Sequence, residues 1–257
     1  MGIWCRPGGC RAGIAFNFMS VLRLENLNKS FGALVVADNV TMEVTKGEAL
    51  GIIGPNGAGK STLFNLIAGN ITADSGRIEF DGDDVTSVPT MKRTKAGIGR
   101  SFQIPQPFQN MTVFENLLAS AAFGQDRPEA QLVDECAEIL EQTGLMAQAN
   151  MLAGKLTLLE RKRLELSRAL ATGPKLLLLD EIAGGLTEAE CASLISTIRH
   201  IHARGVTIVW IEHVLHALTS VVGRLVVLDF GRIIASGAPD RVMALDEVRE
   251  IYLGMEA

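Results

Sequence analysis

One segment of nine residues, Gly54 to Thr62, constrains this chain more than any other feature of its sequence. It reads GPNGAGKST and matches the pattern GxxxxGK followed by Ser or Thr. An apolar run at 49–53 precedes it, and an apolar helical pattern at 63–67 follows it. A glycine-rich turn between a strand and a helix directs backbone N–H groups inward at the positive helix end, where they bind phosphates. The segment therefore predicts nucleoside triphosphate binding by Gly54, Pro55, Asn56, Gly57, Ala58, Gly59, Lys60, Ser61 and Thr62.

Two carboxylates, Asp180 and Glu181, end the apolar run at 176–179. Ligands bind at the C-terminal ends of parallel strands in open α/β sheets. We expect Lys60 to bridge the β- and γ-phosphates, and Ser61 and Asp180 to hold Mg²⁺. We expect Glu181 to orient the attacking water as a general base. These roles predict hydrolysis of ATP.

A histidine follows the next apolar strand. His213 comes after the run at 206–211, which is expected to lie near the strand that carries Asp180. We predict a hydrogen bond from His213 to the γ-phosphate.

The order of apolar patterns predicts an α/β fold. An antiparallel β region at the start leads into a parallel sheet. The expected strands are 21–27, 35–44, 49–53, 77–80, 175–179, 206–211 and 225–228, and the expected helices are 111–122, 128–142, 159–172 and 188–203. In the second helix Leu132, Val133, Cys136, Ile139 and Leu140 share one face. We predict one domain at 19–257, with its core at 19–87 and 156–257 and an inserted helical subdomain at 88–155.

The first 18 residues read as a leader without function. They weakly resemble a signal peptide, but no small-residue cleavage site follows. Met19 leads directly into the first strand, so translation is expected to begin there. The choice between Met1 and Met19 stays open.

Charge and hydropathy limit the partners of this chain. Its net charge of −5 argues against nucleic acid as a partner, because that role needs a basic surface. No apolar stretch approaches the roughly 20 residues of a membrane helix, so any membrane role comes through a partner. The four cysteines have no metal-ligand spacing, which fits a reducing, cytoplasmic compartment.

Together these residues resemble the ABC ATPase family from Val21 onward, which implies its P-loop NTPase fold. The resemblance implies that Gln103, in the segment Arg100 to Gln103, contacts the metal at the nucleotide site and links it to the helical subdomain. It also implies that Phe31 stacks on adenine. The loop at 104–108 is a candidate contact with a membrane subunit.

Segments at 97–103, 111–117, 211–213 and 252–254 are similar to one branch of that family, the importers of branched-chain and other hydrophobic amino acids and amides. Such systems combine a periplasmic binding protein, two transmembrane permease subunits and two different ATPases. The resemblance thus places this chain at the cytoplasmic face of the inner or plasma membrane as a peripheral subunit.

One segment departs from the family pattern. The family signature Leu-Ser-Gly-Gly-Gln aligns with Leu156 to Glu160, where leucines replace both glycines and Glu160 adds negative charge near a triphosphate. Ile182 stands where a proline is usual, and Thr187 stands for an aspartate and is predicted to form a capping box with Glu190. In this family each ATP lies between one subunit's phosphate segment and the other's signature. The hypothesis is a heterodimer with one active site, although a homodimer stays open.

Three other functions stay open. A non-catalytic nucleotide-binding partner is favoured by the altered signature and opposed by Glu181 and His213. An ATPase of a lipopolysaccharide-type exporter has a similar cassette. An ABC ATPase of DNA repair or translation is disfavoured, because no coiled-coil insertion, second cassette or basic arm is present.

Overall fold

The computed structural model describes residues 20–253, so the predicted leader at 1–18 lies outside the described residues. A four-stranded antiparallel sheet has the order β2-β1-β4-β5; its strands are β1 (Ser20–Phe31), β2 (Leu34–Thr45), β4 (Ser75–Phe80) and β5 (Asp83–Asp84). A six-stranded sheet has the order β10-β9-β3-β8-β7-β6; its strands are β3 (Ala49–Ile53), β6 (Ile98–Arg100), β7 (Leu176–Asp180), β8 (Thr207–Ile211), β9 (Arg224–Asp229) and β10 (Arg232–Gly237). The second sheet is parallel except for β10, which runs antiparallel to β9.

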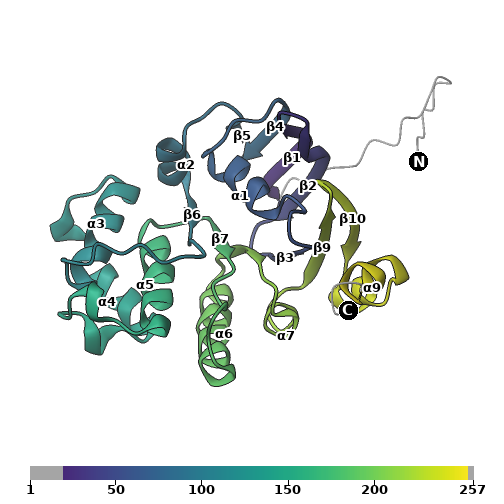
Figure 1. The fold of residues 1–257 in the computed structure, drawn as a ribbon. Helices are drawn as coiled ribbons and strands as arrows, with labels where there is room; N and C mark the ends of the chain where they lie inside the picture. Colours follow the sequence, from purple (N-terminus) through teal and green to yellow (C-terminus); the bar gives the residue numbers. More distant parts are fainter. Residues whose placement is uncertain (1–19, 254–257) are drawn as a thin grey trace, which may run out of the picture.

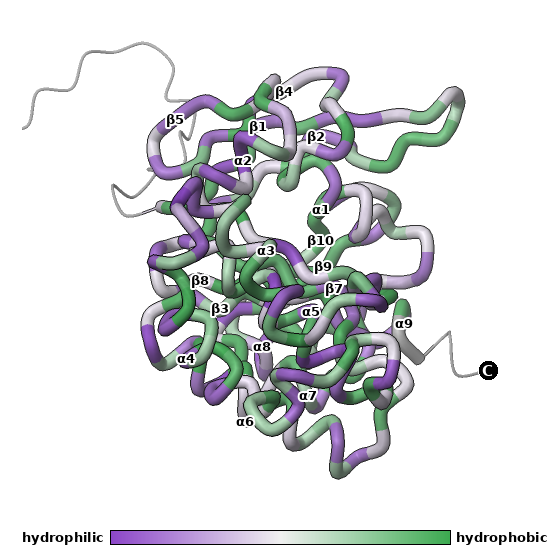
Figure 2. The backbone as a smooth tube through the Cα atoms, turned by 90° about the vertical axis from the view of Figure 1, so that its left-hand side faces the viewer, coloured by the Kyte–Doolittle hydropathy of each residue, from purple (hydrophilic) through white to green (hydrophobic). Residues whose placement is uncertain are grey.

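The helices fall into a group around the sheets and a separate helical group (Figure 1). The first group comprises α1 (Lys60–Ala68), α2 (Thr90–Ala96), α6 (Glu188–Ala203), α7 (Leu215–Thr219), α8 (Pro239–Met243) and α9 (Asp246–Leu253). The helical group comprises α3 (Val113–Gln125), α4 (Val133–Thr143) and α5 (Leu158–Ala171), which pack on one another. In both Figures 1 and 2 the antiparallel sheet lies at the top and α6 and α7 lie at the bottom. No helix within residues 20–253 is long and apolar enough to cross a membrane.

Both faces of the parallel sheet are covered. Along β7, Leu176 and Leu178 belong to the apolar core shared with β1, β2 and α1, whereas Leu177 and Leu179 belong to the core shared with α6 and the helical group. All four leucines are fully buried. Burial on both faces explains the unbroken apolar run, since successive side chains of a strand point to opposite faces.

Three helices begin at the same sequence pattern, Thr-x-x-Glu. Thr112, Thr157 and Thr187 cap α3, α5 and α6, and each exchanges hydrogen bonds with the glutamate three residues later. Such capping boxes satisfy backbone N–H groups that have no partner within the helix. The predicted box of Thr187 and Glu190 is confirmed, and the box at Thr112 moves the start of α3 from the predicted 111 to Val113.

The predicted helix at 128–142 was wrong at its start. A short 3₁₀ turn (Glu129–Gln131) precedes α4, which begins at Val133 and ends before Gly144. Val133 is 43% exposed, so its assignment to the buried face was wrong, although Leu132, Cys136, Ile139 and Leu140 are buried. Val133 is the first residue of α4, and in α-helical geometry it lies at the edge of the face that is centred on Cys136.

Candidate nucleotide-binding site

The segment Gly54 to Thr62, here called the phosphate loop, joins β3 to α1. A Cβ atom on Gly54 would lie 2.0 Å from the Leu228 carbonyl oxygen, and one on Gly59 would lie 2.2 Å from the Val36 carbonyl oxygen. Only glycine fits at these two positions, because the loop packs directly on the backbone of β2 and β9. Gly59 also has φ of +99°, in the region that favours glycine.

Lys60 lies under the phosphate loop and is 5% exposed. Its Nζ donates to the carbonyl oxygens of Gly54 (2.7 Å) and Pro55 (2.9 Å). Burial lowers the pKa of this amine, and the nearby carboxylates of Glu181 and Asp180 oppose that shift. A cavity of about 250 Å³ lies over the loop; it is lined by Leu34, Val36, Asn56, Gly57, Ala58, Gly59, Lys60, Ser61, Thr62 and Glu181. A glycine cradle with a buried lysine at a helix start fits a polyphosphate.

Asp180 ends β7 and is held by an arginine from the neighbouring strand β6. The guanidinium Nη2 of Arg100 donates to Asp180 Oδ2 (2.8 Å), and its Nη1 donates to Asn65 Oδ1 (2.6 Å). The guanidinium lies 5.8 Å and 5.1 Å from the ring centres of Phe64 and Phe102. This role of Arg100 was not predicted from sequence, because strand pairing rather than sequence spacing brings it to Asp180.

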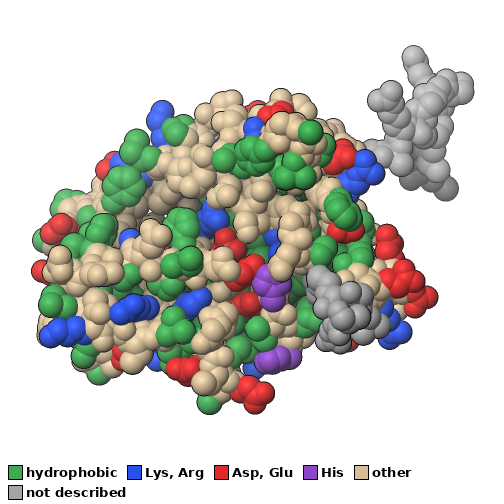
Figure 3. Space-filling view, viewed as in Figure 1, with side chains coloured by type: hydrophobic (Ala, Val, Ile, Leu, Met, Phe, Trp, Pro, Cys, Tyr) green, Lys and Arg blue, Asp and Glu red, His purple; other side chains and the backbone are tan. Residues whose placement is uncertain are grey.

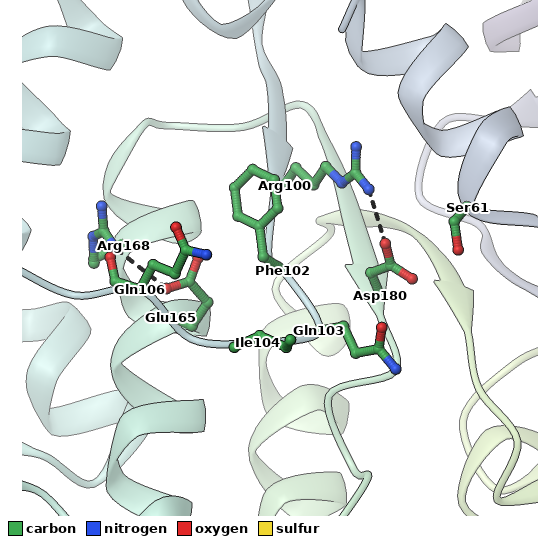
Figure 4. Close-up of a pocket in the computed structure, with 9 residues that line it drawn as sticks. All are labelled: Ser61, Arg100, Phe102, Gln103, Ile104, Gln106, Glu165, Arg168 and Asp180. Carbon is green, nitrogen blue, oxygen red and sulfur yellow. Dashed lines mark hydrogen bonds and ion pairs between the residues drawn. The ribbon is translucent and has the colours of Figure 1, made fainter.

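Asp180 and Ser61 line a second cavity of about 510 Å³, between the phosphate loop and α5 (Figure 4). Figure 4 shows the Ser61 hydroxyl across from the Asp180 carboxylate, with Gln103 below them. A hydroxyl, a carboxylate and an amide are oxygen donors of the kind that Mg²⁺ accepts alongside phosphates and water. Within residues 20–253 no cluster of three or more His, Cys, Asp or Glu side chains could hold a metal by itself.

Three of the predicted residues meet at the edge of the parallel sheet; we call Gln103, Glu181 and His213 the Glu181 cluster. His213 Nε2 lies 2.7 Å from Glu181 Oε1, and Gln103 Nε2 donates to Glu181 Oε2. The Glu181 side chain is 15% exposed, and that of His213 is 43% exposed. The three residues follow β6, β7 and β8 in turn, so the order of the parallel strands brings them together. On the face viewed in Figure 3, acidic, basic and histidine side chains gather near the centre.

Phe31 lies apart from the cavity over the phosphate loop. It ends β1, is 52% exposed, and has Lys29 Nζ 5.4 Å from its ring centre. Besides Ala58 of the phosphate loop, the apolar side chains that line that cavity are Leu34 and Val36, which were not predicted from sequence as site residues. The signal that could have found them is their apolar character shortly after Phe31, at the start of β2.

The segment that departs from the family signature forms the start of α5. Glu160 folds back onto the helix: Oε2 accepts hydrogen bonds from the Thr157 backbone N–H (2.8 Å) and hydroxyl (3.0 Å), and Oε1 accepts one from Gln148 (3.0 Å). The Leu158 side chain is 46% exposed. The negative charge of Glu160 therefore lies at the positive end of α5. The Thr157 hydroxyl donates its hydrogen bond to this carboxylate.

A family model described as ABC transporter matches residues 37–184, which span the phosphate loop, Gln103 and Glu181. The chain belongs to the ABC transporter family. It is an ABC ATPase, an ATP-binding cassette whose hydrolysis of ATP energises a transporter. The ABC ATPase fold predicted from sequence is confirmed, because a cassette of an ABC transporter solved in its ADP conformation superimposes with a TM-score of 0.84 at 35% identity. That match covers 92% of this chain and 99% of the solved chain.

Two curated relatives of this ABC ATPase differ in their transport systems. The probable branched-chain amino acid transport ATP-binding protein LivG of Methanocaldococcus jannaschii is 36% identical and covers 92% of this chain and 98% of its own length. The lipopolysaccharide export system ATP-binding protein LptB of Haemophilus influenzae is 34% identical, with the same two coverages. These identities are too close to separate the two branches.

Proposed function

We propose that this ABC ATPase energises an importer of branched-chain or other hydrophobic amino acids or amides, bound to permease subunits at the cytoplasmic face of the membrane. The observation that carries its ATPase role is Glu181, held between Gln103 and His213 beside the phosphate loop. The importer branch rests on the similarity to LivG and on the segments at 97–103 and 211–213. The periplasmic binding protein of such a system acts on this chain only through the permease.

The phosphate loop binds the triphosphate of ATP in this proposal. Its backbone N–H groups and Lys60 neutralise the β- and γ-phosphates, and Phe31, exposed at the end of β1 outside the cavity, stacks on adenine. Ser61, Asp180 and Gln103 would hold Mg²⁺, which would supply charge neutralisation to the phosphates when bound. Glu181 accepts a proton from the attacking water. His213 donates to the γ-phosphate, and Gln103 links the nucleotide site to the helical group.

A lipopolysaccharide-type exporter is the alternative, favoured by the similarity to LptB. The test reconstitutes the chain in proteoliposomes with a second ABC ATPase and the transmembrane permease subunits of such an importer. We expect a binding protein loaded with leucine to stimulate ATP hydrolysis, and the unloaded protein to stimulate it less. Stimulation only by lipopolysaccharide would reassign the chain to export.

The contact with the permease is expected at the loop 104–108, where Ile104 is 70% exposed and Phe108 is 52% exposed.

The working complex in this proposal is a heterodimer. The start of α5 already binds the Glu160 carboxylate, and this negative charge repels a second anion. The start of α5 therefore binds the γ-phosphate of ATP on another subunit weakly. The exposed Leu158 adds bulk at the same place. The phosphate loop and the Glu181 cluster of this chain carry no such defect, so a second ABC ATPase with an intact signature completes the working site.

The heterodimer predicts a partner-dependent result in light scattering. The Glu181→Gln chain, alone with ATP and Mg²⁺, is expected to stay monomeric, because α5 does not clasp ATP. Adding the second ATPase is expected to give an ATP-dependent dimer. A dimer of the Glu181→Gln chain alone would show that Thr157 to Glu160 still clasps ATP, and the homodimer would replace the heterodimer.

A further inference from the structure

A buried lysine lies directly beneath the Glu181 cluster. Lys162 is on α5, is 4% exposed, and directs its Nζ toward the core of the molecule rather than toward solvent. The Nζ donates to the carbonyl oxygens of Gln103 (2.8 Å) and Glu181 (3.3 Å). One cation from the helical group therefore holds the backbone of two members of the cluster.

A buried glutamate holds the same cluster from the other side. Glu212 follows β8 and is 1% exposed. Its Oε1 accepts from the Ala183 backbone N–H (2.7 Å), and its Oε2 accepts from the His213 backbone N–H (2.9 Å). The Val214 backbone N–H also donates to this carboxylate. Glu212 thus ties the segment after Glu181 to the segment that carries His213.

The conformation of Glu181 depends on such contacts. Its φ is +45°, a left-handed conformation that residues other than glycine rarely adopt. Its backbone N–H donates to Ile211 O (2.9 Å) and its carbonyl oxygen accepts from the Gly184 N–H (3.4 Å). To these main-chain bonds the two buried charges add the Lys162 bond to the Glu181 carbonyl oxygen and the Glu212 bond to Ala183. Strained backbone persists where its surroundings over-determine it, and it is concentrated at functional sites.

Burial by itself disfavours the charged forms of both Lys162 and Glu212. Burial lowers the pKa of Lys162 and raises the pKa of Glu212, and the Glu212 charge in turn raises the pKa of Lys162. Buried charges are tolerated where they are paired and hydrogen-bonded. The hydrogen bonds of this pair go mainly to the backbone of the residues that carry the reactive side chains.

We propose that Lys162 and Glu212 are positioning residues for ATP hydrolysis, which fix the backbone of Gln103, Glu181 and His213 so that the three side chains converge. The inference rests on the proposed roles of the Glu181 cluster. Because Lys162 belongs to α5, it also makes the position of Glu181 depend on how the helical group sits against the parallel sheet.

Arg93 offers a matched control for a buried cation with a purely structural role. It is 1% exposed and donates to the carbonyl oxygens of Leu66, Ile67, Thr86 and Val88. None of these four residues lines the two cavities of the nucleotide-binding site. Loss of Arg93 removes hydrogen bonds from backbone carbonyl oxygens, as loss of Lys162 does, but at a distance from the cluster.

The test compares Lys162→Met, Glu212→Gln and Arg93→Met in the complex with the second ATPase. We expect Lys162→Met and Glu212→Gln to lower kcat by about 10- to 100-fold, because small displacements of reacting groups are costly. The Kd for ATP is expected to stay near the wild-type value, since the phosphate loop is unchanged. Arg93→Met is expected to lower the Tm while the folded protein keeps its kcat. Lys162→Arg is expected to restore part of the rate.

Two outcomes distinguish a failure of the positioning role from a failure of the proposed function. A wild-type kcat in both Lys162→Met and Glu212→Gln, with Glu181→Gln inactive, would overturn the positioning role and leave the proposed function standing. An active Glu181→Gln would contradict the proposed function itself. If Lys162→Met does not fold, Glu212→Gln and Lys162→Arg decide the question, because each keeps a polar group of similar size at the buried position. Equal losses of kcat and ATP affinity would indicate a structural role only.

Discussion

Glu181→Gln is expected to lower ATP hydrolysis by the assembled transporter ATPase about 10²- to 10⁴-fold, the usual contribution of a general base. The amide keeps the size of the carboxylate and can still bond to Gln103 and His213, but it does not accept a proton from water. ATP binding is expected to persist, because Lys60 and the phosphate loop are unchanged. Steady-state phosphate release and ATP binding by fluorescence titration measure the two effects separately.

Glu190→Gln is the matched control for this substitution. Glu190 is also a hydrogen-bonded glutamate close along the chain, but it caps α6 through Thr187. Its substitution is expected to leave the hydrolysis rate near wild type. A Glu181→Gln protein that hydrolyses ATP within a few-fold of wild type would mean that another group activates the water.

Gly59→Ala is expected to destabilise the fold and to abolish ATP binding. The new Cβ would lie 2.2 Å from the Val36 carbonyl oxygen, and the φ of +99° disfavours any L side chain. The left-handed conformation costs about 1–2 kcal/mol for alanine. Displacing the backbone of β2 adds about 1–3 kcal/mol, as overpacking does in cores. Urea unfolding measures the loss in free energy of unfolding.

Gly82→Ala separates the two contributions. Gly82 has a φ of +90°, in the turn between β4 and β5, and a Cβ atom added there would have no atom of residues 20–253 within 4 Å beyond its chain neighbours. This substitution is expected to lower the free energy of unfolding only by the cost of the left-handed conformation, about 1–2 kcal/mol. ATP binding is expected to stay unchanged. Equal losses of stability in Gly59→Ala and Gly82→Ala would show that the phosphate loop does not pack against β2 as described.

Local patterns predicted the longer core strands and helices, and the parallel sheet could be inferred from them. The short elements β5, β6, α2, α7, α8 and the C-terminal α9 were not predicted. The strand 49–53 and the helix 188–203 have the predicted bounds, because a glycine turn and a capping box mark their ends. The strand β10 was missed, since Arg232–Gly237 is half-exposed and lacks a continuous apolar run. Val133 was assigned to the face of Cys136 and Leu140, but as the first residue of α4 it lies at the edge of that face and is exposed.

The site was predictable where a motif is contiguous and only partly where contacts are distant. The phosphate loop is one segment, so its residues could be named from sequence. Gln103 and Glu181 are 78 positions apart, and only the strand order and the family resemblance connected them. The bonds of Lys162 and Glu212 to the backbone around Glu181 leave no sequence pattern, because a backbone carbonyl or N–H is present at almost every position.

The central claim is that the phosphate loop and Glu181 of this chain form the working ATP site of a two-ATPase complex. The most direct measurement is the hydrolysis rate of that complex with the Glu→Gln substitution placed in this chain or, separately, at the corresponding position of the second ATPase. We predict that Glu181→Gln in this chain abolishes hydrolysis, whereas the substitution in the second ATPase leaves most of it. Hydrolysis that survives Glu181→Gln and disappears with the other substitution would contradict the account.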